Sequence, residues 1–239
     1  MMIKSLFVVL ISVSFLYAGP PFFTDDPQPV DFMHWEFYLS SAMQYSGNDA
    51  DITLPHIEVN YGLVPDIQIH LILPMQYTKR ESNKQYGYVN TEIGLKYRLI
   101  NEESGLQVGI FPLAEIPTGK NVTLAGDNKF KTFLPVWIQE TKGKFTTYGG
   151  AGYWINPGTG NKNWFYAGWM GQYDFSETFT LGSELYYQTA SSQVAFASTG
   201  FSVGGYININ EHNHILFAVG HNISGDTFTT GYIGYQVTI

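Results

Sequence analysis

The chain has 239 residues, of which 44% are hydrophobic, 16% aromatic and only 13% charged. Soluble domains carry about 25% charged residues, so this protein folds but has an unusually uncharged surface. A formal net charge of −8 argues against a nucleic-acid partner, because phosphate binding needs clustered cations. The absence of cysteine excludes disulfides, thiol nucleophiles and cysteine-ligated metals.

The first residues predict export. Lys4 precedes an apolar stretch over residues 6–16, and the small residues Ala18 and Gly19 offer a cleavage site. This pattern predicts a secretory signal peptide over residues 1–18. The stretch is shorter than the about 20 residues that a membrane-spanning helix needs, so a mature chain in a membrane would have to be a closed β-barrel.

Period-two alternation runs through almost all of the remaining chain. In residues 34–46, Trp35, Phe37 and Leu39 alternate with polar residues such as Glu36 and Ser40, which is strand spacing. Similar patterns predict twelve strands: 34–46, 53–61, 67–77, 89–99, 106–115, 132–141, 145–155, 164–175, 179–188, 197–209, 214–222 and 228–239.

The connections between these strands fall into two classes. The turns after even-numbered strands are short, at 62–66, 101–105, 142–144, 176–178 and 210–213. Those after odd-numbered strands are mostly longer and polar, at 47–51, 78–87, 116–131, 156–163, 189–196 and 224–227. An even strand count with this asymmetry is typical of bacterial outer-membrane barrels. We therefore expect an all-β protein: a closed antiparallel transmembrane barrel of about 12 strands over residues 34–239, preceded by an extended segment, 19–33, that is either a periplasmic tail or a plug in the lumen.

The scarcity of charge indicates which strand face meets lipid. The polar faces carry mainly Ser, Thr, Gln, Asn, Gly and Tyr, which suits an interior better than a solvated exterior. Trp35, Tyr97 and Tyr173 lie near strand ends, as in the aromatic girdles of membrane barrels. The alternative is a soluble, secreted β-sandwich that binds a ligand, because aromatic residues favour strands in any β protein.

A barrel of about twelve strands leaves a narrow passage, wider than that of eight strands and narrower than that of sixteen. The candidate lumen-lining residues are Glu36, His56, Glu58, His70, Glu92, Lys96, Arg98, Glu115 and Glu184. We expect Lys96 and Arg98 to neutralise two of these carboxylates. The alternative role for this set is a polar network that braces and plugs the barrel. The loop 116–131 either folds inward as a constriction or stays in solvent outside.

The sequence predicts no enzyme, no cofactor and no metal site. His221 and Ser224 are the only pair that suggests a hydrolase, but strand alternation sends them to opposite faces. His212 and His214 have metal-ligand spacing but flank a turn, and no third ligand is evident.

Four segments resemble one family of outer-membrane proteins. They are Gly19–Pro27 followed by His34, Trp35 and Glu36; Tyr61–Asp66; Glu92–Arg98; and Ile116–Gly119. Together they resemble the barrels catalogued under the meta-pathway of phenol degradation, described as putative transporters. The resemblance implies passage of small hydrophobic or aromatic solutes across the outer membrane. The partners expected are outer-membrane lipids, the barrel assembly machinery and small solutes, and the alternative function is that of a plugged structural or adhesive barrel.

Overall fold

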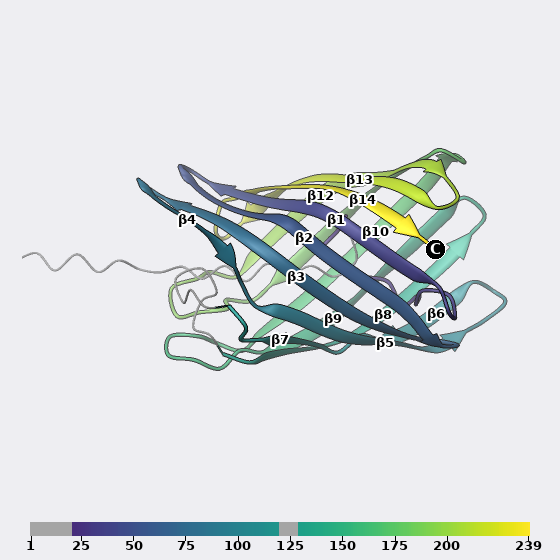
Figure 1. Cartoon of the computed structure of the whole chain (residues 1–239), viewed down its shortest axis with the longest axis horizontal. Helices are drawn as coiled ribbons and strands as arrows, with labels where there is room; N and C mark the ends of the chain where they lie inside the picture. The colour runs from purple at the N-terminus through teal and green to yellow at the C-terminus, as the bar shows by residue number, and fades with distance from the viewer. Residues whose placement is uncertain (1–20, 120–128) are drawn as a thin grey trace, which may run out of the picture.

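The computed structural model describes residues 21–119 and 129–239, which form a closed antiparallel β-barrel (Figure 1). The predicted signal peptide lies outside the described residues. Within the described ranges, no helix is long and apolar enough to cross a membrane.

The strands follow one another around the ring in chain order. Their bounds are β1 (Trp35–Ser46), β2 (Asp49–Val64), β3 (Ile67–Arg80), β4 (Asn83–Tyr88), β5 (Thr91–Asn101), β6 (Leu106–Ile110), β7 (Leu113–Ile116), β8 (Lys131–Lys142), β9 (Phe145–Ile155), β10 (Trp164–Ser176), β11 (Phe179–Gln188), β12 (Ser198–Asn210), β13 (Asn213–Ser224) and β14 (Thr229–Thr238).

The ring has twelve strands because two of them are interrupted. β3 pairs with β4 along one half and with β5 along the other, and β8 pairs in the same way with β6 and β7. Pairing of β1 with β14 and of β3 with β5 closes the sheet on itself. The predicted fold class is confirmed, and closure leaves the barrel without a free sheet edge.

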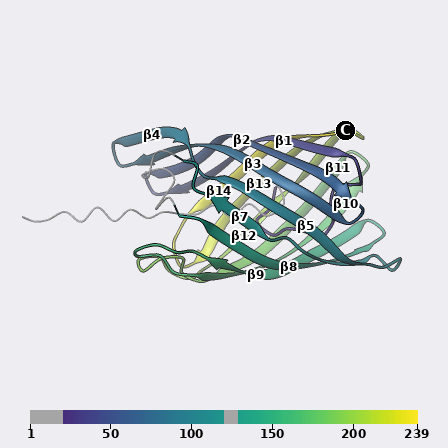
Figure 2. The same ribbon diagram turned by 60° about the horizontal axis from the view of Figure 1, so that its bottom comes forward.

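The predicted boundaries differ most from the structure at two places. Residues 78–87 were expected to form a polar loop, but most of them belong to the β3–β4 hairpin, which projects at the end of the barrel away from the C-terminus (Figure 2). The strand expected over 106–115 is broken between β6 and β7 at Phe111 and Pro112. Proline has no N–H to donate to a sheet ladder, so a break is expected there.

Strand β8 shows how the two faces of the barrel differ. Leu134, Val136 and Ile138 are 51%, 53% and 36% exposed, whereas the alternating Phe133 and Trp137 are each only 1% exposed. Large apolar side chains on most other strands are exposed in the same way. Their exposure around a closed ring is the arrangement of a lipid-facing surface and rules against the alternative of a water-soluble sandwich.

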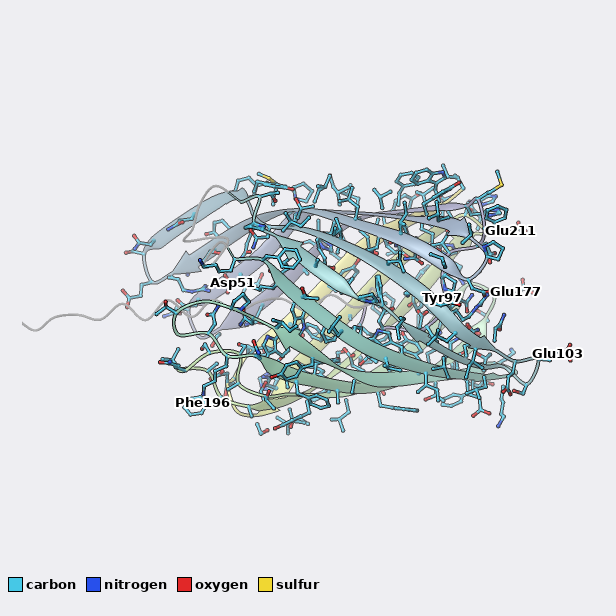
Figure 3. The ribbon with its side chains drawn as sticks, turned by 90° about the horizontal axis from the view of Figure 1, so that it is seen from below. Asp51, Tyr97, Glu103, Glu177, Phe196 and Glu211 are labelled. Carbon is cyan, nitrogen blue, oxygen red and sulfur yellow. The ribbon has the colours of Figure 1, made fainter. Side chains whose placement is uncertain are left out.

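The two ends of the barrel differ in their connections. Residues 65–66, 102–105, 143–144, 177–178 and 211–212 form what we call the short-turn end. Figure 3 shows Glu103, Glu177 and Glu211 together at this end, with Phe196 toward the other. Residues 117–119, 129–130, 156–163, 189–197 and 225–228 lie between strands at the long-loop end.

Candidate solute pathway inside the barrel

Residues 21–34, here called the inner segment, precede β1. Residues 21–30 lie inside the barrel, whereas residues 31–34 are exposed at its end. Phe22, Thr24 and Asp25 are 3%, 0% and 1% exposed. Their polar contacts reach Glu184 on β11 and Lys96 on β5, which lie on opposite sides of the ring. The inner segment therefore occupies the space that a solute would have to cross.

Glu184 binds the inner segment through two successive backbone amides. Its Oε1 accepts a hydrogen bond from the N–H of Phe23 at 3.0 Å, and its Oε2 accepts one from the N–H of Thr24 at 2.9 Å. Ser202 donates a third hydrogen bond to Oε1 at 2.7 Å. The Thr24 hydroxyl also lies 3.1 Å from the Tyr166 hydroxyl. Hydrogen bonds to a carboxylate are about twice as strong as neutral ones, so Glu184 is the main polar anchor of this segment.

Lys96 binds the inner segment from the other side. Its Nζ lies 3.0 Å from Asp25 Oδ1 and 3.6 Å from Asp26 Oδ1, and it donates a hydrogen bond to the carbonyl of Gln28 at 3.4 Å. The ring of Phe111 lies 4.9 Å from Nζ.

The expectation that Lys96 and Arg98 neutralise glutamates of the wall was wrong. Lys96 pairs with Asp25 and Asp26, and Arg98 pairs with Asp66 in the turn after β2, at 2.7 Å. Strand spacing predicts only neighbours within the wall, whereas the inner segment brings its own carboxylates closer to Lys96.

Glycines of the wall make room for the inner segment. A Cβ on Gly168 would lie 2.1 Å from Thr24 Oγ1, and a Cβ on Gly62 would lie 2.0 Å from the carbonyl oxygen of Asp31. Neither distance is possible without movement, so the segment packs directly against bare backbone. A cavity of about 30 Å³ remains between the segment and the wall, next to Phe22 and Tyr232. A volume of this size holds one or two water molecules.

Several predicted lining residues form a buried polar network on β1, β2, β3 and β5, here called the polar wall. His70 Nδ1 lies 2.7 Å from Asn60 Oδ1, and its Nε2 lies 3.3 Å from Glu92 Oε1. Asn60 donates to Glu58 Oε1 at 2.8 Å, and His56 Nδ1 lies 3.0 Å from the Ser40 hydroxyl. Ser40, His56, Glu58, Asn60, His70 and Glu92 are all at most 9% exposed.

The remaining predicted lining residues have other polar partners, although Glu115 lies directly across from Glu92 of this network in the strand register. Glu36 is half-buried and accepts a hydrogen bond from the Tyr38 hydroxyl at 2.8 Å. Glu115 pairs with Lys131 at 3.2 Å on the neighbouring strand. The expected constriction by loop 116–131 falls largely outside the described residues.

The opposite side of the interior carries a buried aromatic cluster, here called the aromatic wall. It consists of Phe111, Leu113, Phe133, Trp137, Trp154, Trp164, Tyr166 and Tyr186. The rings of Phe133 and Trp154 are stacked with centroids 5.0 Å apart, and those of Trp154 and Trp164 are stacked at 5.6 Å. Phe23 of the inner segment packs against this wall.

Sequence reasoning missed the aromatic wall, although β8 carries a signal for it. Residues 133–138 are apolar on both faces of the strand. Such a run is typical of a strand that is buried on both sides, so the inward face could have been predicted to meet apolar partners.

The groups considered for catalysis and metal binding have other partners. His221 Nδ1 lies 3.0 Å from the Thr229 hydroxyl, and His214 Nδ1 lies 2.8 Å from Asn208 Oδ1. Within residues 21–119 and 129–239, no group of three or more His, Asp or Glu side chains is arranged to hold a metal ion.

No protein-family model matches the chain, and no curated protein matches its sequence. Solved structures do match its fold. The COG4313 outer membrane channel from Pseudomonas putida F1 aligns with a TM-score of 0.72 and 13% identity over 90% of this chain and 98% of that chain. The KdgM porin in complex with disordered oligogalacturonate aligns at 0.59 and 10%, over 84% and 98%. The CymD monoaromatic hydrocarbon channel aligns at 0.51 and 8%, over 87% and 89%.

At these identities the likeness establishes the fold. Together with the apolar exterior, it is the fold of a barrel of the bacterial outer membrane. The resemblance to the phenol meta-pathway family stays a prediction.

Proposed function

We propose that this protein is an outer-membrane channel for small apolar or aromatic solutes. The observation that carries the proposal is the aromatic wall, a run of stacked rings inside a barrel whose neighbours in fold are channels and porins. One of those neighbours is described as a monoaromatic hydrocarbon channel, and the sequence resemblance noted above points to the same class of solute.

The eight residues of the aromatic wall are at most 3% exposed, so their ring faces and hydrogen-bond donors become available to a solute only when the inner segment moves. The indole N–H groups of Trp137 and Trp154 are buried and have no hydrogen-bond partner within the described part of the chain. Buried donors without partners are uncommon because each costs free energy. A solute that stacks on these rings and carries an oxygen would satisfy such a donor.

The second candidate is a plugged barrel with a structural or adhesive role. The position of the inner segment favours it, because Thr24 and Asp25 are almost wholly buried and the cavity beside Phe22 is small. Under the channel proposal, the inner segment has to move away from its buried position before a solute can pass.

Release from proteoliposomes distinguishes the two candidates. Phenyl glucoside and methyl glucoside are neutral and cross lipid slowly, so both can be loaded into vesicles that contain the purified protein. A channel with an aromatic lining releases phenyl glucoside faster than methyl glucoside, although phenyl glucoside is the larger molecule. Release of neither compound above that of protein-free vesicles contradicts the channel proposal and favours the plugged barrel. Faster release of methyl glucoside contradicts the aromatic preference alone.

A further inference from the structure

The cationic side chains that face the interior are already bound to carboxylates. Each of the four described lysines and arginines at inward strand positions lies within 3.2 Å of a carboxylate oxygen. The pairs are Arg80 with Asp51, Lys96 with Asp25, Arg98 with Asp66, and Lys131 with Glu115. An anion entering the barrel therefore meets no interior cation that lacks a carboxylate partner among the described residues.

Several interior carboxylates, by contrast, have no lysine or arginine partner in the described chain. Glu58 and Glu92 lie 3.6 Å and 3.3 Å from the same histidine, His70, and Glu58 also accepts a hydrogen bond from the neutral Asn60. Glu184 accepts from the backbone N–H groups of Phe23 and Thr24 and from the Ser202 hydroxyl, all of them neutral donors. Glu58 Oε2 is buried and has no hydrogen-bond partner at all among the described residues.

The unpartnered atom Glu58 Oε2 is a second observation, which indicates that this region can accept a positively charged or hydrogen-donating group. A buried carboxylate oxygen normally has a partner because leaving it bare costs free energy. Every inward lysine and arginine among the described residues is paired, and the Glu58 carboxylate is only partly satisfied. The interior therefore offers more unmatched partners to a positive charge than to a negative one.

The polar wall and the aromatic wall adjoin at Phe111. The ring of Phe111 belongs to the aromatic wall, and His70 of the polar wall packs edge-on against it with centroids 5.2 Å apart. The Phe111 ring already lies 4.9 Å from a cation, Lys96 Nζ, which also pairs with Asp25. Aromatic faces and carboxylates both attract positive charge, so the junction of the two walls already holds the kind of charge that we expect the interior to accept.

We infer that the interior selects aromatic solutes by charge, passing neutral and cationic ones and rejecting anionic ones. This inference rests on the channel function proposed above. An anionic solute would lose its hydration without gaining a cationic partner. Fields inside a charged passage change local solute concentration and rates by factors of 10 or more.

The test uses three compounds that share a phenyl ring and differ in charge: phenyltrimethylammonium, phenyl glucoside and benzenesulfonate. Each is loaded into proteoliposomes at neutral pH, and its release is followed by ultraviolet absorbance. We expect release of benzenesulfonate to be on the order of tenfold slower than that of phenyltrimethylammonium, with phenyl glucoside closer to the cation. Equal release of the two ions, or faster release of the anion, overturns the inference while leaving the channel proposal standing. Release of none of the three contradicts the channel proposal itself.

The Glu58→Gln, Glu92→Gln double variant tests whether these two carboxylates set the preference. We expect the ratio of cation to anion release to fall at least threefold toward one. A matched control is Glu211→Gln, which removes a carboxylate at the short-turn end (Figure 3) and should leave the ratio unchanged. Folded outer-membrane barrels migrate differently on detergent gels before and after heating, and this shift serves as the test of folding. If a folded double variant keeps the wild-type ratio, Glu58 and Glu92 do not set the charge preference. The wild-type ratio tests the inference even if the double variant does not fold.

Discussion

The anchor at Glu184 yields the sharpest prediction. Glu184→Gln removes the charge from a group that accepts three hydrogen bonds, from Phe23, Thr24 and Ser202. It also places an amide N–H₂ opposite one of the backbone N–H donors, where it cannot accept. Hydrogen bonds to a charged group contribute about 1.5–3 kcal/mol and neutral ones about 1 kcal/mol. Loss of one bond and weakening of the others therefore destabilises the docked inner segment by about 3 kcal/mol, which raises its undocked population roughly a hundredfold.

The absence of cysteine from the chain makes this population measurable. A single Thr24→Cys substitution places a thiol at a position that is 0% exposed, so a membrane-impermeant maleimide reacts with it only when the inner segment leaves its place. In this Thr24→Cys protein, we expect the additional substitution Glu184→Gln to raise the rate of maleimide labelling by about one to two orders of magnitude. Both proteins carry the Thr24 substitution, so the comparison reports the effect of Glu184 alone.

Two controls separate undocking from unfolding. Glu177→Gln changes a glutamate of the short-turn end (Figure 3) and should leave the labelling rate of the Thr24 position as it was. Folded barrels should also keep their heat-modifiable migration on gels. If Glu184→Gln leaves labelling unchanged in a folded barrel, Glu184 is not the anchor and the reasoning above is refuted.

Three further predictions concern the exterior, the wall glycines and the buried ion pair. Val136→Arg puts a charge on the lipid-facing surface near the middle of β8, so it should lower the free energy of unfolding in lipid by about 2–4 kcal/mol, as measured by urea titration of tryptophan fluorescence. Gly168→Val pushes against Thr24 and should raise the ion conductance of single proteins in planar bilayers, because the inner segment is displaced. Lys96→Met leaves Asp25 buried without its cation, which should cost about 3–5 kcal/mol of folding stability, whereas adding Asp25→Asn should restore most of it.

Each of these has a result that contradicts it. Unfolding of the Val136 variant at the wild-type urea concentration would mean that this face does not meet lipid. Gly231→Ala is the control for Gly168, because its new Cβ comes no closer than 3.6 Å to another atom. An equal rise in conductance in both glycine variants would show that the effect is not steric displacement of Thr24. For Lys96, additive losses in the double variant would show that the pair is not coupled.

The candidate site was only partly predictable from strand patterns. Alternation placed His56, Glu58, His70, Glu92, Lys96 and Glu184 on one face of their strands, and all six are buried. It did not identify their partners. Glu58 and Asn60 contact each other within one strand, whereas Glu184 and Thr24 are 160 residues apart. Contacts between residues so far apart in the chain depend on how the whole ring closes, and a local sequence pattern does not predict that closure.

The sequence alone determined the architecture, because period-two alternation, scarcity of charge and asymmetric connections act locally or as averages over the whole chain. Lipid accepts apolar side chains only on a sheet whose backbone groups are all paired, so these features require a closed barrel with an apolar exterior. The interior was decided by tertiary structure. Whether residues 21–30 lie inside the ring depends on the fit between distant groups: bare backbone at Gly62 and Gly168, a carboxylate at Glu184 and a cation at Lys96. The β3–β4 hairpin was missed for a related reason, since the polar residues of β4 are held as a strand by pairing with β3 and not by a hydrophobic pattern of their own.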